Sequence, residues 1–184
     1  LLWNGGVDEL VPVLGPIDSA PEYPDSLFVN GIGSPVTFRF RADIVARTGL
    51  APERFATLVH PTAQVSPRAH LGPGSVVLHN ATIAAQTTLG HHVMVLHNAT
   101  VGHDVVVGRH TCIAGGCCIN SRVEVGDGCF LGGGTSIREG VRIGDGSLIN
   151  TGSAVFRDVR AHSVVAGNPA RFLRPVAEPE ALQA

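Results

Sequence analysis

The sequence predicts a mainly β fold in which short parallel strands stack into a triangular prism. An aliphatic residue recurs at every sixth position from Val59 to Val155 without insertion, which makes seventeen consecutive hexads. The fifth place of each hexad is small or β-branched. The six residues 77–82 recur unchanged eighteen residues later, at 95–100. Three hexads therefore make one coil, and residues eighteen apart lie above one another.

A period of six excludes the ordinary regular structures. A helix with 3.6 residues per turn would scatter these positions around its axis, and a strand has a period of two. Short strands joined by tight bends fit the period, with coils stacked about 4.8 Å apart. We expect the aliphatic side chain to point inward and the fifth-place residue to fill the corner. We expect glycine at the second place to supply the bend torsions, in seven hexads: Gly72, Gly90, Gly102, Gly108, Gly126, Gly132 and Gly144.

The period divides the chain into three parts. Residues 58–160 form the prism. Residues 1–57 lack the period and predict a truncated α/β segment, with a strand at 27–29, the turn Gly31-Ile32-Gly33 and a helix over about 36–48 that ends at Gly49. Residues 161–184 are expected to form a C-terminal loop and tail.

Composition excludes several classes of protein. The net charge is −2, charged residues make up 15% of the 184 residues, and no block of five like charges occurs. A disordered chain or a sequence-independent nucleic-acid surface is therefore not expected. The sequence contains no apolar run of about 18 residues, so no membrane span is predicted. The four cysteines form no C-x-x-C pair and no secretory signal is present, which favours a reducing compartment, the cytoplasm.

Four local motifs give the chain a family resemblance. They are the ending Gly-Asn-Pro-Ala-Arg (167–171), the stretches at 11–15 and 28–33, the junction Phe55–Pro61, and Val101–Gly108 with its His103-Asp104 pair. Together with the hexads, they resemble the hexapeptide-repeat acyltransferases, in particular the sialic-acid and bacillosamine type sugar O- and N-acetyltransferases. The chain departs from this group in lacking its opening Gly-rich turn, and in having Cys112 where relatives often carry a second histidine.

The resemblance implies a fold and a reaction. The prism would be a left-handed parallel β-helix, and residues 1–57 a partial Rossmann-like segment that binds a nucleotide sugar. The protein would form a homotrimer with active sites between neighbours and use acetyl-CoA as co-substrate, with no metal. His103 would take the proton from the acceptor, and Asp104 would orient its imidazole. Histidine suits this role because its ordinary pKa leaves it mostly neutral at pH 7.

Binding residues are predicted from the columns and the ends of the chain. His79 and His97 share a corner that continues as Gly115, Gly133 and Thr151, so this corner changes from bulky to bare. We expect the pantetheine arm of CoA along the bare stretch, and the CoA phosphates at the C-terminal turn. The predicted CoA residues are Gly115, Gly133, Asn150, Thr151, Gly152, Gly167, Asn168 and Arg171, with Arg174 beside them. The predicted substrate residues are Gly31, Ile32, Gly33, His79 and His97, although the two histidines could instead form a stacked surface ladder or a trimer contact.

The predicted function is N-acetylation of a nucleotide-linked amino sugar, at a 4-amino group, by direct transfer. Cys112 and Cys118 are weaker candidates for a nucleophile because neither has a paired base. The alternatives are O-acetylation of a sialic acid or another small alcohol, a non-catalytic prism, and a zinc enzyme of the gamma carbonic anhydrase type. The zinc alternative is disfavoured because no two histidines lie 36 residues apart.

Overall fold

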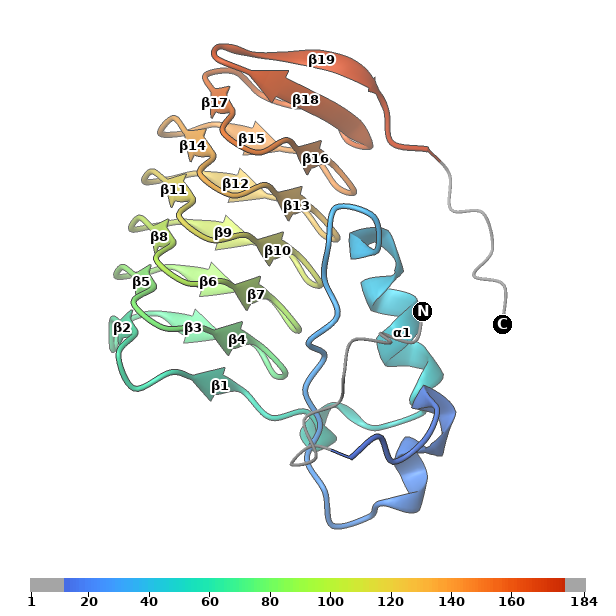
Figure 1. Ribbon diagram of the computed structural model, residues 1–184. Helices are drawn as coiled ribbons and strands as arrows, with labels where there is room; N and C mark the ends of the chain where they lie inside the picture. Colours follow the sequence, from blue (N-terminus) through green and yellow to red (C-terminus); the bar gives the residue numbers. More distant parts are fainter. Residues whose placement is uncertain (1–11, 178–184) are drawn as a thin grey trace.

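The computed structural model, which describes residues 12–177, is a parallel β-helix flanked by a short N-terminal segment (Figure 1). The predicted parallel β-helix is confirmed. Each of its seventeen strands has two residues, the sixth and the first of successive hexads. They are β1 (Leu58–Val59), β2 (Gln64–Val65), β3 (His70–Leu71), β4 (Val76–Val77), β5 (Thr82–Ile83), β6 (Thr88–Leu89), β7 (Met94–Val95), β8 (Thr100–Val101), β9 (Val106–Val107), β10 (Cys112–Ile113), β11 (Cys118–Ile119), β12 (Glu124–Val125), β13 (Phe130–Leu131), β14 (Ser136–Ile137), β15 (Arg142–Ile143), β16 (Leu148–Ile149) and β17 (Ala154–Val155).

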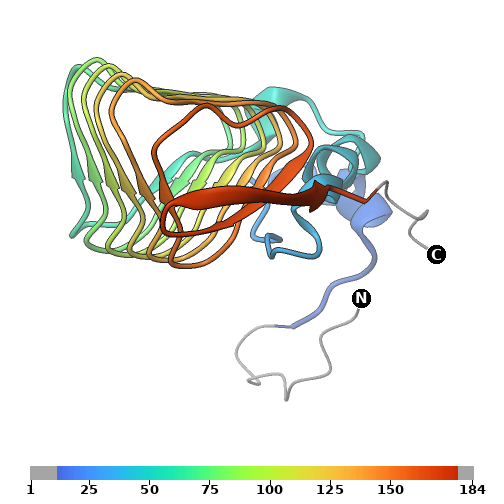
Figure 2. The same ribbon diagram turned by 90° about the horizontal axis from the view of Figure 1, so that it is seen from above.

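The strands form three parallel sheets, one on each face of the prism. The eight-stranded sheet has the order β1-β4-β7-β10-β13-β16-β18-β19, the six-stranded sheet β17-β14-β11-β8-β5-β2, and the five-stranded sheet β15-β12-β9-β6-β3. Partners between β1 and β17 lie eighteen residues apart, as in the pairing of Val76 with Met94. Seen along the axis, successive coils superimpose on a triangular outline (Figure 2).

The core is built from two places of every hexad. First-place side chains such as Ile83, Leu89 and Val95 are at most 1% exposed, and fifth-place residues such as Ala81 and Val93 are fully buried. Both places point inward because each strand is flanked by a bend. The prediction for these two places is confirmed by the interior coils.

The predicted role of the second-place glycines is wrong. The left-handed torsion lies at the fourth place instead, at residues as different as Asn98 (φ 57°), Asp104 (φ 58°) and Gly134 (φ 67°). The second-place glycines serve close packing between coils: a Cβ on Gly108 would lie 2.4 Å from the carbonyl carbon of Gly126 in the next coil. Glycine is needed there because coils stack at the strand spacing and leave no room for a side chain.

Three corners connect the sheets and are named here by their third and fourth places. The first corner follows the eight-stranded sheet and holds His79, His97, Gly115, Gly133 and Thr151 with the residues after each. The second corner follows the six-stranded sheet and holds Ala85, His103, Ser121, Glu139 and Arg157 with the residues after each. The third corner follows the five-stranded sheet and holds Pro73, His91, Arg109, Asp127 and Asp145 with the residues after each. Ala161 and His162 continue it in the last coil, where the spacing is sixteen residues.

The N-terminal segment lies beside the eight-stranded sheet (Figures 1 and 2). Its elements are η1 (Ile17–Glu22), η2 (Phe38–Phe40), α1 (Arg41–Arg47) and η3 (Pro52–Arg54). The helix predicted over 36–48 is present as η2 continuing into α1, and Gly49 adopts φ 62° after it. The prediction of a strand at 27–29 is wrong, since Phe28 forms only an isolated parallel bridge with Phe55.

The C-terminal part differs from the expected loop. β18 (Ser163–Gly167) pairs in parallel with β16, and β19 (Ala170–Pro175) returns antiparallel to it. This hairpin covers the end of the prism and places the 167–171 turn over the last coil (Figure 1). The predictions for the stretch before residue 12 and for the tail beyond residue 177 lie outside the described residues. No helix within residues 12–177 is both long and apolar enough to cross a membrane.

Candidate active site

His103 and Asp104 form a contacting pair on the second corner. They occupy the third and fourth places of one hexad, and the Nδ1 atom of His103 lies 2.6 Å from Oδ2 of Asp104. Both side chains are about half exposed. The left-handed backbone of Asp104 is the common fourth-place conformation. Because the carboxylate holds Nδ1, the Nε2 atom is left to exchange a proton with a substrate.

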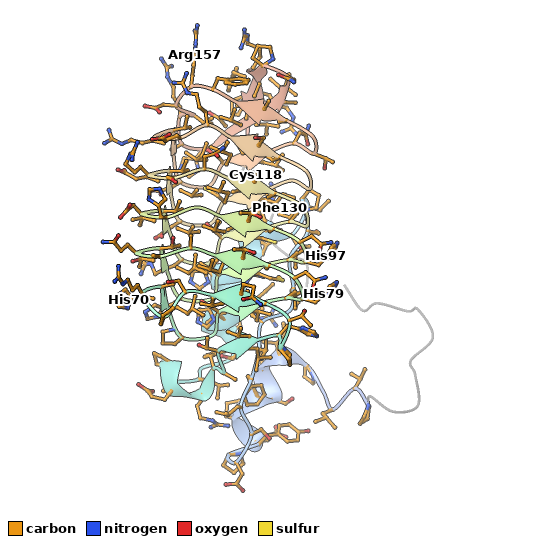
Figure 3. All side chains as sticks on the ribbon, turned by 90° about the vertical axis from the view of Figure 1, so that its left-hand side faces the viewer. His70, His79, His97, Cys118, Phe130 and Arg157 are labelled. Atoms are coloured by element: carbon orange, nitrogen blue, oxygen red, sulfur yellow. The ribbon has the colours of Figure 1, made fainter. Side chains whose placement is uncertain are left out.

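The same corner carries a group of arginines beyond His103. A hollow of about 300 Å³ is lined by Arg138, Phe156, Arg157 and Arg171, with Pro169 and Ala170 of the hairpin. Within residues 12–177, the guanidinium groups of Arg138 and Arg157 form no ion pair or side-chain hydrogen bond. Arg157 lies at the C-terminal end of the prism (Figure 3). Unpaired guanidinium groups around a hollow suit a phosphate ligand.

The spacing of the coils relates these two features. His103 and Arg157 hold the same place in coils that are 54 residues, and therefore three coils, apart. Three coils span about 14 Å at the strand spacing. The histidine pair and the arginine hollow thus lie on one corner, separated by roughly the length of an extended chain of a dozen atoms.

The first corner carries a ladder of imidazoles that ends in glycine. The ring of His79 stacks on that of His97, with 5.2 Å between centroids and 8° between planes, and His60 meets His79 edge-on at 5.7 Å. Figure 3 shows His79 and His97 one above the other on one edge of the prism. Within one chain, His79 and His97 therefore form a stacked ladder on the surface, which was one of the alternatives to a role in substrate binding.

The bare stretch of the first corner begins later than predicted. The ring of His97 covers Gly115, since a Cβ there would lie 2.7 Å from Nε2 of His97. Beyond it, no side chain lies within 4 Å of the Cβ position of Gly133 or Gly152. Asn150, Thr151 and Gly152 are exposed. The open surface therefore runs from Gly133 to Gly152.

Within one chain, the two predicted sites are not brought together. The glycine stretch is on the first corner and His103 is on the second, with the six-stranded sheet between them. Cys118 lies on that sheet, facing outward between the two corners (Figure 3). One chain alone does not combine both sites into a single cleft.

The substrate residues predicted in the N-terminal segment lie at a cavity and its edge. A cavity of about 410 Å³ is lined by Gly31 and Ile32, together with Tyr23, Asn30, Phe28, Thr48 and other residues of the segment. Gly33 lies against the prism instead, where a Cβ would come within 2.8 Å of Cε of Met94. Gly31 and Ile32 are exposed, so the loop is open to a ligand.

The C-terminal residues separate into two groups. Gly167 (φ 101°) and Asn168 are exposed in the hairpin turn, and Arg171 lines the arginine hollow. Arg174 does not line the hollow, and its Nη1 donates to the carbonyl of Pro175. Arg138, Phe156 and Arg157 were not singled out from the sequence, although reading the His103 corner two and three coils further would have found them.

The cysteines are all free. Cys112 is buried, and burial raises the pKa of its thiol to about 11. A thiol that is protonated and inaccessible is a poor nucleophile. Within the part of the chain that the structure describes, no three His, Cys, Asp or Glu side chains group so that they could hold a metal ion.

Comparison with known proteins adds a family and structural neighbours. The model of the bacterial transferase hexapeptide (six repeats) matches residues 122–157. No curated protein matches the chain. A histidine-to-asparagine variant of perosamine N-acetyltransferase from Caulobacter crescentus, in complex with CoA and GDP-perosamine, is similar with a TM-score of 0.80 and 25% identity, over 89% of this chain and 78% of that one.

Two further structures have the same fold. The acetyltransferase domain of PglB from Neisseria gonorrhoeae, in complex with acetyl coenzyme A, gives a TM-score of 0.70 and 28% identity, over 80% of this chain and 82% of that one. WeeI from Acinetobacter baumannii gives 0.79 and 22% identity, over 92% and 81% of the two chains, and supports the fold alone. The repeat and the prism make the chain similar to hexapeptide-repeat acetyltransferases, and sugar N-acetyltransferases are among its structural neighbours.

Proposed function

We propose that the protein transfers the acetyl group of acetyl-CoA to the 4-amino group of a nucleotide-linked sugar. The observation that carries the proposal is the His103–Asp104 pair on the same corner of the prism as Arg138 and Arg157 of the hollow. Sugar N-acetyltransferases with CoA bound are among the structural neighbours, which supports the reaction class.

His103 acts as the general base. Its Nε2 takes a proton from the amine as the nitrogen attacks the thioester carbonyl, and the resulting imidazolium is stabilised by Asp104 at Nδ1. The tetrahedral intermediate then collapses and releases CoA as the thiolate, which takes up a proton. A positioned base of this kind contributes about 10²–10⁴ to the rate.

CoA lies at a seam between two copies of the chain. The arginine hollow takes its phosphates, and about 14 Å of corner between the hollow and His103 accommodates the pantetheine arm. The bare first corner of a neighbouring chain, from Gly133 to Gly152, closes over that arm. Because the two corners lie apart within one chain, the proposal requires a cyclic homotrimer, in which each active site combines two chains.

The nucleotide sugar is held by the N-terminal segment. The cavity of about 410 Å³ has apolar walls and polar groups at Tyr23, Asn30 and Thr48, which suits a nucleobase and ribose. Gly31 and Ile32 at its wall would support the diphosphate and direct the sugar toward the prism. The free thiols are in keeping with the reducing cytoplasm as the place of action.

Acetyl transfer to a panel of UDP-, GDP- and dTDP-linked 4-amino sugars, detected by mass spectrometry, tests this function. We expect transfer to one of them, with His103→Ala slowed at least about 10²-fold and Asp104→Asn by at least about 10-fold. Glu124→Gln, an exposed carboxylate on β12, is the matched control and should retain full activity. Sialic acid and serine are tested in parallel as acceptors, and transfer to one of these alone would replace N-acetylation by O-acetylation. Unchanged transfer by His103→Ala would remove the proposed base.

A further inference from the structure

Arg41, the first residue of α1, is the most deeply buried charged side chain of the N-terminal segment. Only 1% of it is exposed. None of the ion pairs among the described residues includes Arg41. Its guanidinium is instead surrounded by backbone carbonyls, and burial lowers its pKa from the ordinary value.

Three carbonyl groups from two parts of the molecule accept hydrogen bonds from Arg41. Nε donates to the carbonyl of His110 at 3.0 Å, and Nη2 donates to that of His92 at 2.7 Å. These two residues lie one above the other on the third corner of the prism. Nη1 donates to the carbonyl of Ile32, in the glycine loop. One side chain therefore ties the loop to two successive coils.

The loop itself is fitted closely to this arrangement. Asn30 is buried, and its Oδ1 accepts the N–H of Ile32 at 3.1 Å. A Cβ on Gly33 would lie 3.1 Å from Nη1 of Arg41 and 2.8 Å from Cε of Met94. Any larger residue would have to displace the ends of these two side chains, so glycine allows the loop to pack closely against the eight-stranded sheet.

A buried guanidinium without a counter-ion is a poor choice for stability alone. Desolvation of the charge is costly, and no carboxylate among the described residues offsets it. What Arg41 supplies, and an apolar residue cannot, is a fixed set of directions to three carbonyls. Its fork therefore defines where the loop sits on the prism.

We propose that Arg41 is a positioning residue for the nucleotide sugar, which it serves by fixing the Gly31–Gly33 loop on the prism. This inference rests on the proposed function, in which the loop directs the sugar toward the prism. Arg41 does not touch the acetyl donor, whose hollow lies at the second corner. Replacement of Arg41 should therefore change KM for the nucleotide sugar more than KM for acetyl-CoA.

The test compares Arg41→Met and Arg41→Lys with Arg47→Met. Arg47 belongs to the same helix but is exposed and paired with Asp18, so it controls for a changed arginine in α1. We expect Arg41→Met to raise KM for the nucleotide sugar about tenfold or more, with KM for acetyl-CoA within about twofold, because small misplacements of a bound group are costly. Arg41→Lys should be intermediate, since an ammonium cannot reach all three carbonyls in the same geometry.

Hydrogen exchange of residues 28–34 gives a readout that needs no activity. We expect faster exchange of this segment in Arg41→Met, intermediate exchange in Arg41→Lys and unchanged exchange in Arg47→Met. Equal changes in both KM values, or a lowered Tm with unchanged exchange of the loop, would overturn the proposal and leave a purely structural role. If the wild-type protein acetylates no nucleotide sugar, the proposed function fails, and unchanged loop exchange in Arg41→Met would then separately overturn the role of Arg41.

Discussion

The imidazole of His92 stacks on that of His110, with 5.1 Å between ring centroids and 9° between planes. His92 is 5% exposed, and Phe55 meets its other side edge-on at 4.6 Å. Desolvation, together with the smaller effects of the nearby charges of His110, His91 and Arg41, lowers the pKa of His92 to about 4. Burial, with Arg41 and Arg109, also lowers the pKa of His110. The stack is therefore neutral at pH 7.

This stack predicts a loss of stability in mild acid. In the unfolded chain His92 takes up a proton as the pH falls through about 6.5, whereas in the folded chain it does so only near 4, so stability falls across that window. The contribution of His92 alone is about 2 kcal/mol between pH 7.5 and 5. Urea unfolding at both pH values measures it.

His92→Asn isolates this contribution. Asparagine holds the same place at Asn80 and Asn98, with the same left-handed backbone, so the variant keeps the corner and removes the titration. We expect a much weaker pH dependence in His92→Asn and no change in His70→Asn, which is exposed on β3. An equal acid sensitivity in wild type and His92→Asn would contradict the neutral stack.

The arginine hollow predicts a change in cofactor affinity. Arg157→Ala should raise KM for acetyl-CoA about tenfold, because it removes a charge-assisted contact to phosphate, and should leave KM for the nucleotide sugar unchanged. Steady-state kinetics at low and high salt measure both. Arg142→Ala is the control, since Arg142 is already paired with Glu124 on the five-stranded sheet. An unaltered KM for acetyl-CoA in Arg157→Ala would place the phosphates elsewhere.

Much of the fold could be predicted because the repeat is local. The spacing of six sets the strands, and the repetition at eighteen stacks Val76 on Met94 and His79 on His97. His103 and Asp104 are adjacent in the sequence, so their contact follows from the corner alone. For such positions, the sequence number gives the coil and the corner directly.

The remaining features depend on contacts that no local pattern encodes. Two of the three carbonyl partners of Arg41 lie 51 and 69 residues away, so its burial follows from how the N-terminal segment docks. Arg171 reaches Arg138 and Arg157 only because a hairpin folds back over the last coil. The role of the second-place glycines depends on the gap between coils rather than on backbone torsion, and the hexad pattern alone does not specify that gap.

The two kinds of glycine should therefore respond differently to alanine. Gly108→Ala places a Cβ 2.4 Å from backbone of the next coil, whereas Gly128→Ala meets nothing within 4 Å but keeps φ near 60°. We expect Gly128→Ala to cost about 1–2 kcal/mol, the price of a left-handed alanine, and Gly108→Ala to cost clearly more. Thermal unfolding ranks them. A larger loss in Gly128→Ala would restore backbone torsion as the decisive factor.

If each active site lies between two chains, two inactive variants should complement each other in mixed trimers. His103→Ala removes the base on the second corner. Gly133→His places an imidazole on the bare first corner, at the hexad place that already accepts His79 and His97, and so blocks the pantetheine path without disturbing the coil. Each variant alone should be nearly inactive. Co-expressed trimers should recover about a quarter of wild-type activity, because in random assembly one seam in four joins an intact His103 to an intact Gly133.

Acetyl transfer is measured per chain on the whole co-expressed population, and purification of a sample through two different tags verifies that mixed trimers form. The double variant mixed with the wild type is the control, since it too leaves about one seam in four with both corners intact when assembly is random. Recovery in both mixtures supports a site shared between neighbouring chains. No recovery in the mixture of single variants, with recovery in the control, would mean that His103 and Gly133 serve the same active site from one chain, which the separation of their corners by the six-stranded sheet argues against.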